Sequence, residues 1–241
     1  MTRNVIVTGG SSGIGRAVAA RFAAAGDRVL ITGRRQDRLD GTLRALPDTV
    51  RAVLCDSTNP VQLAELAASS TDRIDVLVNN AGGNTDLEAP DPQNLAGLAR
   101  AWRANLEANL LGPALTTEAF RHRLADGGSV VHLGSIAADQ GAGAYGAAKA
   151  GLASWNLSLA RELGPRGITC NVVSPGYTVG TEFFRDRMTQ ERHDALIART
   201  ATGRAGTVED IAESVWFLAS PGARQITAQV LNVNGGARAT R

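Results

Sequence analysis

Cysteine and histidine are scarce in this chain of 241 residues. The two cysteines, Cys55 and Cys170, each stand in a short apolar run typical of a strand, so we expect buried free thiols and a reducing compartment. His122, His132 and His193 are scattered without the spacing of metal ligands. The sequence therefore argues against a disulfide-stapled fold and against a bound metal ion.

Concentrated charge and long apolar stretches are also missing. The formal net charge is +2 and the sequence pI is near 8.8, but no segment gathers the basic residues as a nucleic-acid-binding surface would. The apolar runs are far shorter than the roughly 20 residues of a membrane-spanning helix, and the start of the chain lacks the apolar region of a signal peptide. We therefore expect a cytoplasmic protein with no membrane or nucleic-acid partner.

Lysine is almost absent. Of the 25 basic residues, 24 are arginine and one, Lys149, is lysine. The chain thus uses arginine almost wherever a cation suffices. Lysine at a single position points to a place where a compact ammonium is needed, because the guanidinium group is larger and its charge is delocalised.

What is present is a regular alternation of apolar strands and amphipathic helices. We predict strands at residues 5–7, 28–31, 52–54, 76–78, 129–133, 168–173 and 230–233. We predict helices at residues 14–25, 36–46, 61–68, 95–121, 145–163 and 208–218. Most strands are continuous apolar runs, as in sheets covered on both faces, and the alternation indicates a parallel sheet with right-handed crossovers. The prediction is a single α/β domain over residues 1–241.

Residues 176–204 interrupt this alternation. The segment is helical but irregular and contains Tyr177, Phe183 and Phe184. It follows the carboxyl end of the sixth strand, where open α/β sheets bind ligands. Two interpretations stay open, a lid over a substrate site and a simple connecting excursion.

A glycine-rich turn follows the first strand. Residues 8–15 read Thr-Gly-Gly-Ser-Ser-Gly-Ile-Gly and lead into a helix. Glycines let the backbone approach a pyrophosphate closely, and a helix N-terminus offers free N–H groups and the positive end of its dipole. Three residues separate Gly9 from Gly13, so the spacing differs from the G-x-G-x-x-G form. The strand before the turn and the helix after it still predict a dinucleotide site.

The end of the second strand favours NADP(H) over NAD(H). A carboxylate commonly stands there to bond the ribose 2′-hydroxyl of NAD. This chain has Gly33 followed by Arg34 and Arg35, and guanidinium groups bind a 2′-phosphate by forked hydrogen bonds. The alternative is a solvated basic helix start, which the helix dipole disfavours unless an anion is bound.

Ser135, Tyr145 and Lys149 are the candidate catalytic residues. Ser135 closes the fifth strand, and Tyr145 and Lys149 are four residues apart, so they share one face of a helix. An unperturbed tyrosine has a pKa near 10, and a neighbouring ammonium would lower it toward the range useful for acid–base work. Ser135 would then hydrogen-bond the substrate oxygen or the phenol.

Together with residues 8–15, Asp56, residues 79–82, Asn109 and Pro175-Gly176, these residues make the chain closely similar to the short-chain dehydrogenase/reductase family over essentially its whole length. The resemblance implies a single-domain, doubly wound Rossmann fold with a seven-stranded parallel sheet flanked by helices. It implies a catalytic tetrad of Asn109, Ser135, Tyr145 and Lys149, in which Lys149 also bonds the nicotinamide ribose and Asn109 holds a water that links Lys149 to solvent. Asp56 would contact the adenine, and residues 79–82 would support the middle of the cofactor.

Some of these roles have structural alternatives. The expected cofactor-binding residues are Gly9, Ser11, Ser12, Gly13, Ile14, Gly15, Arg34, Arg35, Asp56, Ser57, Asn80, Ala81, Gly82, Tyr145, Lys149, Pro175, Gly176 and Thr178. Asp56 could instead be a helix cap, and residues 79–80 could make a strand-ending turn, whereas Asn109 fits a helix interior poorly. The spacing from Ser135 to Tyr145 is shorter than is usual in such proteins. The threonine that contacts the nicotinamide amide could be Thr178 or Thr181.

The function expected is reduction of a small-molecule ketone to an alcohol with NADPH. Residues 149–152, 203–206 and 232–236 resemble bacterial 3-oxoacyl-(acyl carrier protein) reductases. The alternatives are an alcohol dehydrogenase working in the oxidative direction and a nucleotide-sensing protein without activity, while a serine hydrolase at Ser135 would lack its Gly-x-Ser-x-Gly turn.

We also expect a homo-oligomer, a tetramer with a dimer as the alternative. The resemblance implies that the helices of residues 95–121 and 145–163 pair with their counterparts in a second copy of the chain. Both carry more apolar side chains than one sheet face needs, namely Leu106, Leu110, Leu111, Leu152, Trp155 and Leu159.

Overall fold

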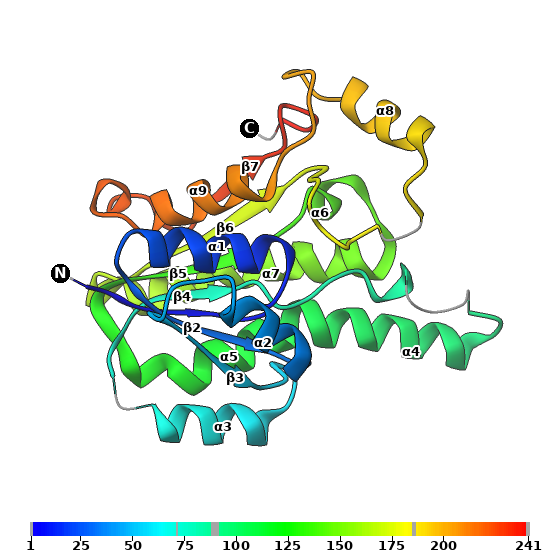
Figure 1. Cartoon of the computed structure of the whole chain (residues 1–241). Coiled ribbons are helices and arrows are strands. Elements are labelled where there is room, and N and C mark those ends of the chain that lie inside the picture. The colour runs from blue at the N-terminus through cyan, green and yellow to red at the C-terminus, as the bar shows by residue number, and fades with distance from the viewer. Residues whose placement is uncertain (1, 71, 88–91, 185–186, 240–241) are drawn as a thin grey trace.

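The computed structural model describes residues 2–70, 72–87, 92–184 and 187–239 (Figure 1). Seven strands form one parallel sheet in the order β3-β2-β1-β4-β5-β6-β7. Their bounds are β1 Asn4–Val7, β2 Arg28–Gly33, β3 Val50–Leu54, β4 Ile74–Asn79, β5 Leu124–Leu133, β6 Thr169–Pro175 and β7 Val230–Val233. The order reverses at β1, which lies between β2 and β4, so the carboxyl ends of β1 and β4 border the crevice where such sheets bind ligands.

Helices cover both faces of the sheet. In Figure 1, α1 (Gly13–Ala24) and α9 (Val208–Leu218) lie above the sheet, and α3 (Pro60–Ser69) and α5 (Gly112–Phe120) lie below it. The other helices are α2 (Gln36–Leu43), α4 (Leu95–Leu106), α6 (Ala137–Gln140), α7 (Gly143–Leu163) and α8 (Gln190–Ala198). The doubly wound α/β fold and its seven-stranded parallel sheet are confirmed.

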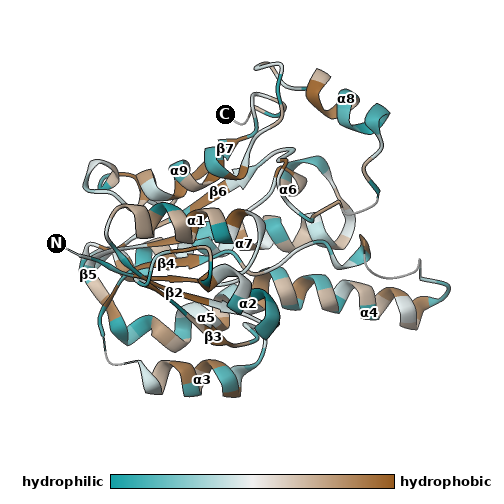
Figure 2. Cartoon of the chain, viewed as in Figure 1, coloured by the Kyte–Doolittle hydropathy of each residue, from teal (hydrophilic) through white to brown (hydrophobic). Residues whose placement is uncertain are grey.

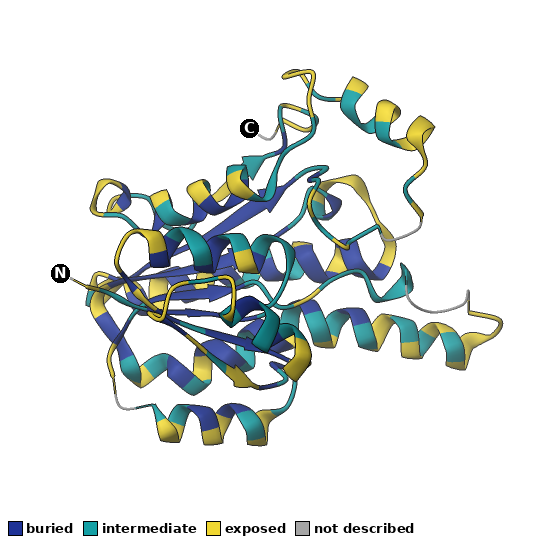
Figure 3. Ribbon diagram, in the orientation of Figure 1, coloured by how far each residue is buried: buried dark blue, intermediate teal, exposed yellow. Residues whose placement is uncertain are grey.

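Each face of the sheet has its own apolar core, visible as brown strands in Figure 2 and dark-blue strands in Figure 3. On one face, Phe22 of α1 and Val215 of α9 pack against the strands and are fully buried. On the other, Leu66 of α3, Phe120 of α5 and Leu159 of α7 pack against the strands and are buried. The strands are apolar on both sides because both sides are covered, as their continuous apolar runs predict.

The long helix predicted at residues 95–121 is wrong in one respect. It is interrupted by a π-helical turn, Glu107–Leu111, in which the Gly112 N–H donates to the Glu107 carbonyl five residues back. Asn109 lies in this turn, and such single-turn widenings often mark functional sites. Strand β5 also begins at Leu124, earlier than predicted, and its register against β4 shifts between Ile74 and Val76.

The apolar surface differs from the prediction as well. Leu152 and Leu159 are fully buried because α7 turns that face toward the sheet, and Leu106, Leu110 and Trp155 are half-buried. Of the predicted set, Leu111 alone is exposed. The exposed apolar side chains of α4 are instead Leu95, Leu98 and Trp102, on the helix that extends to the right in Figure 1. Within the described ranges, the helices are all too short or too polar to cross a bilayer.

Candidate active site

The glycine turn after β1 is shaped by the loop that follows β4. Thr8 Oγ1 accepts hydrogen bonds from the N–H groups of Asn80 and Ala81, each at 3.0 Å. Asn80 Nδ2 donates in return to the carbonyls of Thr8 (2.9 Å) and Gly9 (3.0 Å). The amide of Asn80 thus fixes the shape of the turn, a contact within the chain that the sequence did not reveal.

Two glycines of the turn are required by this close approach. Gly9 has φ of +64°, a conformation that favours glycine. A Cβ on Gly15 would lie 2.3 Å from the Gly9 carbonyl oxygen and 2.4 Å from Asn80 Nδ2. No side chain fits there, so helix α1 begins directly against the turn.

The N-terminus of α1 suits an anion. Ser12 is its N-cap residue, but its extended backbone (φ −161°) is accompanied by no side-chain cap from the described residues, and no acidic residue stands in the first turn. The first N–H groups of the helix are therefore free to bind a ligand, and the helix dipole favours negative charge. An uncapped helix behind a turn without room for side chains fits the pyrophosphate of a dinucleotide. The predicted binding residues Gly9, Ser11, Ser12, Gly13, Ile14 and Gly15 all lie here.

Three arginines stand beside this turn. Arg34 and Arg35 follow β2 and are exposed. Arg35 and Arg38 line a cavity of about 580 Å³, and Arg38 pairs with Glu182 at 2.5 Å. Arg38, in the first turn of α2, was not among the residues expected from the sequence.

Asp56 supports its own loop. Its Oδ1 accepts from the Thr58 N–H (2.9 Å) and hydroxyl (2.8 Å), while Asn59 is the N-cap of α3. Asp56 is therefore not the helix cap considered as an alternative. Its contact with an adenine stays a prediction, as does that of the buried Ser57.

Ser135, Tyr145 and Lys149 come together at the carboxyl end of β5. The loop carrying Ser135 is tied to β6, because the Ile136 N–H donates to the Pro175 carbonyl at 2.9 Å. The short spacing before Tyr145 is filled by the single turn α6, and a Cβ on Gly146 would lie 2.7 Å from the Ala137 carbonyl oxygen. This tight packing brings Tyr145, in the first turn of α7, into hydrogen-bonding contact with Ser135.

The charge state of this group differs from the expectation. Burial raises the pKa of Tyr145, and the Ser135 hydrogen bond lowers it by less. Lys149 does not counteract the burial, because its Nζ donates to the Leu133 carbonyl at 2.7 Å and lies 5.9 Å from the centre of the Tyr145 ring. Burial also lowers the pKa of Lys149, to about 8. The expected lowering of the tyrosine pKa by the ammonium is thus not found.

Asn109 has a structural role that the sequence did not show. Its Oδ1 accepts from the Gly83 N–H (3.0 Å), and its Nδ2 donates to the carbonyls of Gly83 (2.9 Å) and Asn105 (3.0 Å). A Cβ on Gly82 would lie 2.6 Å from this Oδ1. The buried amide holds the loop after β4 against the π-helical turn. The water link to Lys149 stays a prediction.

A second buried polar group lies behind the site. Asn79 Nδ2 contacts His132 Nδ1 (3.1 Å) and donates to Thr117 Oγ1 (2.9 Å). Burial, and then the charge of Lys149, lower the pKa of His132 to about 3, so the ring is neutral at physiological pH. The two asparagines therefore have different contacts, because Asn79 faces the core and Asn80 faces the glycine turn.

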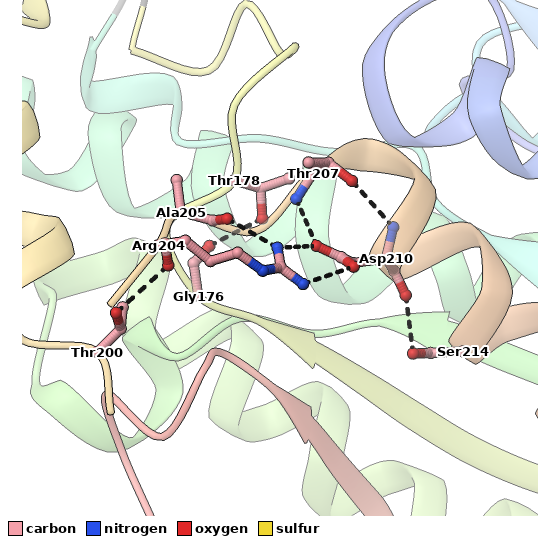
Figure 4. Close-up of polar contacts among 8 residues, drawn as sticks. All are labelled: Gly176, Thr178, Thr200, Arg204, Ala205, Thr207, Asp210 and Ser214. Atoms are coloured by element: carbon pink, nitrogen blue, oxygen red, sulfur yellow. Dashed lines mark hydrogen bonds and ion pairs between the residues drawn. The ribbon is translucent and has the colours of Figure 1, made fainter. Parts of the chain in front are cut away.

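The segment after β6 is anchored at both ends. Thr178 pairs with Gly206, whose N–H donates to the Tyr177 carbonyl at 3.0 Å. Figure 4 shows how Arg204 holds the returning chain, with Nη1 and Nη2 at 2.6 and 3.0 Å from the carboxylate of Asp210. The Arg204 hydrogen bond lowers the pKa of Asp210 to about 2. Asp210 also completes a reciprocal capping box with Thr207 at the start of α9.

Between these anchors, aromatic side chains pack near Tyr145. The Phe183 ring is 5.8 Å from that of Tyr145, and Phe184 lies 5.0 Å from Phe183 and 5.8 Å from Tyr177. The Tyr177 hydroxyl is 2.6 Å from His193 Nδ1. Thr178 and Thr181 both line the cavity of about 580 Å³, and Gly176 packs against Asn234. Neither Ser135 nor Tyr145 lines the cavity, and the Phe183 ring packs against Tyr145.

The burial of Lys149 generates a stability prediction. Lowering its pKa from 10.5 to about 8 corresponds to a cost of about 3 kcal/mol for the charged form. Lys149→Met should therefore raise the free energy of unfolding at pH 7 by about 2 kcal/mol, after about 1 kcal/mol is lost at the unpaired Leu133 carbonyl.

The sign of the pH dependence follows from proton binding. Between about pH 8 and 10.5 the unfolded chain keeps the Lys149 proton and the folded chain does not, so this residue makes wild-type stability rise with pH. The advantage of Lys149→Met should then vanish by about pH 10.5. Urea unfolding at pH 7 and 10.5 measures both, with the exposed Arg161→Met on the same helix as control. An unchanged or reduced stability at pH 7 would contradict the prediction.

Known proteins resemble this chain over nearly its whole length. The family model described as enoyl-(acyl carrier protein) reductase matches residues 9–238. The 3-oxoacyl-(acyl carrier protein) reductase of Escherichia coli (strain K12) is 34% identical over 245 residues, covering 96% of this chain and 95% of that protein.

Two solved structures share the fold. A short-chain dehydrogenase/reductase family oxidoreductase from Burkholderia thailandensis is 36% identical with a TM-score of 0.84, covering 98% of this chain and 93% of that one. A blue fluorescent protein from a metagenomic library, in complex with NADPH, is 31% identical with a TM-score of 0.87, covering 98% of each chain. By sequence over nearly its whole length and by fold, the chain is an oxidoreductase that belongs to the short-chain dehydrogenase/reductase family.

Proposed function

We propose that the protein is an NADPH-dependent reductase that converts a ketone to an alcohol, with Tyr145 as the proton donor. The observation that carries the proposal is the meeting of Ser135, Tyr145 and Lys149 at the end of β5. They stand on the sheet edge that also bears the glycine turn and the uncapped helix N-terminus. A proton donor and an anion site at one edge suit a reaction in which hydride and proton reach the two atoms of a carbonyl.

Each residue has a distinct task in this reaction. Bound NADPH supplies the hydride to the carbonyl carbon. Ser135 donates a hydrogen bond to the carbonyl oxygen and positions it near the phenol. Tyr145 transfers its proton to that oxygen as negative charge develops there. Because burial raises its pKa, Tyr145 is protonated at neutral pH before the reaction. During the reaction the Lys149 ammonium turns from the Leu133 carbonyl toward the phenol oxygen, where its charge stabilises the phenolate that remains.

The preference for NADPH is proposed from the arginines. Arg34 and Arg35 follow the strand end where a carboxylate would favour NAD, and Arg38 adds a third guanidinium at the same edge. The structurally similar blue fluorescent protein was solved with NADPH. This supports the reductive direction, because cellular NADP is kept largely reduced. The oxidative dehydrogenase and the inactive nucleotide sensor remain the competing functions.

The substrate class proposed is a 3-oxoacyl thioester or a related ketone. The E. coli relative is a 3-oxoacyl-(acyl carrier protein) reductase, and Tyr177, Phe183 and Phe184 offer an apolar wall beside Tyr145. The description of the family model favours a second candidate, reduction of an enoyl thioester. Loss of NADPH absorbance with 3-oxoacyl thioesters, simple ketones and enoyl thioesters, and its gain with NADP⁺ and alcohols, distinguishes the candidates. Activity with none of them would favour the nucleotide sensor.

The first kinetic prediction concerns Tyr145 and Lys149. Tyr145→Phe removes the proton donor, so turnover should fall on the order of a hundredfold or more, the range typical of acid–base groups. Turnover of Lys149→Arg should fall by a similar factor, because a guanidinium is larger than an ammonium and its charge acts less locally on the phenol oxygen. Steady-state NADPH oxidation measures turnover, and circular dichroism checks folding. Near-native turnover by a folded Lys149→Arg enzyme would refute the proposed mechanism.

The second kinetic prediction concerns the cofactor. A charge-assisted hydrogen bond to phosphate contributes roughly 1.5–3 kcal/mol, so Arg34→Ala should raise KM for NADPH about tenfold or more. KM for NADH should change little, because NADH has no 2′-phosphate. Equal efficiency of the native enzyme with both cofactors would contradict the preference.

We further propose a homotetramer, with a dimer as the alternative. Leu95, Leu98 and Trp102 of α4, Leu111 of the π-helical turn and Leu157 of α7 are exposed apolar side chains of the elements expected to pair. Burying them between copies would remove apolar surface from water. Light scattering at micromolar concentration should give a multiple of the 25.1 kDa chain mass, and a monomer would refute assembly.

A further inference from the structure

Residues 181–184, here named the strap, cross the edge of the sheet between the arginines and the catalytic tyrosine. Their first side chain lies on the glycine turn, because a Cβ on Gly13 would be 3.6 Å from Cγ2 of Thr181. The next residue, Glu182, pairs with Arg38 of α2 at 2.5 Å. The third, Phe183, packs on Tyr145 at 5.8 Å. Adjacent residues of the strap thus contact the proposed cofactor side and the catalytic side of the site.

The Glu182–Arg38 pair stands between two cavities. One, of about 580 Å³, is lined by Arg35 and the segment after β6, and the other, of about 430 Å³, by Ser11, Ser12 and Arg16 at the glycine turn. Arg38 and Glu182 line both. The pair therefore divides what would otherwise be one groove along the sheet edge. The Glu182 carboxylate rests on a guanidinium in the way that a phosphate oxygen would.

We propose that Glu182 is a specificity-determining latch that the 2′-phosphate of NADP(H) releases. This inference rests on the proposed function. A 2′-phosphate near Arg34 and Arg35 competes with the Glu182 carboxylate for Arg38 and repels it. Release of Glu182 lifts the strap, and with it Phe183, from Tyr145. NAD(H), which lacks this phosphate, leaves the latch closed, so the enzyme exposes its proton donor only after the matching cofactor is bound.

The energetic scale of the latch is modest. The Glu182 side chain is 60% exposed and that of Arg38 is 31% exposed, so the ion pair shifts the balance of closed and open strap by a factor of about two to five. A ligand that favours the open strap should therefore bind a chain without the Glu182–Arg38 ion pair more tightly than the native chain, by the same factor of about two to five.

The test uses nucleotide fragments that carry no nicotinamide and cannot cover Tyr145. Adenosine 2′,5′-bisphosphate carries the 2′-phosphate, and 5′-AMP does not. Nitration by tetranitromethane reports exposure of tyrosine, and the chain has two, Tyr145 and Tyr177, in different tryptic peptides. Mass spectrometry therefore gives the nitration of Tyr145 with Tyr177 as reference. The bisphosphate should raise Tyr145 nitration about two- to fivefold, and 5′-AMP should not.

Two substitutions separate the latch from a merely structural contact. Glu182→Gln should raise nitration of Tyr145 without ligand by about two- to fivefold and tighten the bisphosphate, measured by calorimetry, by the same factor. Arg38→Gln should raise nitration equally but weaken the bisphosphate about tenfold, since it also loses the phosphate contact. Both should leave 5′-AMP unchanged. Glu191→Gln, an exposed carboxylate on α8, is the matched control.

The outcomes are distinct. Two results overturn the latch alone if the enzyme is active with NADPH. One is that Glu182→Gln and Glu191→Gln give the same nitration of Tyr145 and the same affinity for the bisphosphate. The other is that the bisphosphate and 5′-AMP raise nitration of Tyr145 equally. An Arg38→Gln chain with native affinity for the bisphosphate also overturns the latch. A native chain that binds neither nucleotide overturns the proposed cofactor and the latch with it.

Discussion

The site depends on the contact between the turn after β1 and the loop after β4. These strands are neighbours because the strand order reverses at β1, so their carboxyl ends open on the same side of the sheet. Four hydrogen bonds join residues 8–9 to residues 80–81 across this gap, and the packing leaves no room for a Cβ at Gly15. Helix α1 then starts with its N–H groups facing the crevice. The proposed anion site is therefore a consequence of how two backbone loops fit together.

The burial of Lys149, one of the proposed catalytic residues, lowers the stability of the fold. Lys149 is buried at the end of β5 with one carbonyl partner, and burial lowers its pKa to about 8. His132, the residue before Leu133, is buried too and contacts Asn79, and burial, followed by the charge of Lys149, lowers its pKa to about 3, so the ring is uncharged. A second cation so close to Lys149 would be unfavourable. The arrangement explains why a neutral imidazole can lie behind the ammonium.

Much of the fold could be predicted from the sequence, because strands covered on both faces have an unmistakable apolar pattern. The glycine turn and the meeting of Ser135, Tyr145 and Lys149 followed from local spacing. The break in the helix at Asn109 did not, since a π-helical turn depends on the hydrogen bonds of Asn109 to Gly83, 26 residues away. The partners Glu182 and Arg38, 144 residues apart, carry no local signal that joins them. The prediction of surplus apolar surface on the helices was too large, because Leu152 and Leu159 face the sheet and are buried.

The pKa of Tyr145 shows why residue spacing alone does not determine chemistry. A lysine four residues away suggests a lowered tyrosine pKa, yet the described contacts raise it, because Phe183 and the α7 packing remove water from the phenol. Lys149 meanwhile faces the Leu133 carbonyl and the tyrosine ring. Desolvation acts on both groups at once and favours the neutral form of each. Phe183 packs on the Tyr145 ring, so its removal would rehydrate the phenol and lower the pKa of Tyr145. The acid–base properties of Tyr145 thus depend on what buries the phenol as well as on the spacing of the tyrosine–lysine pair.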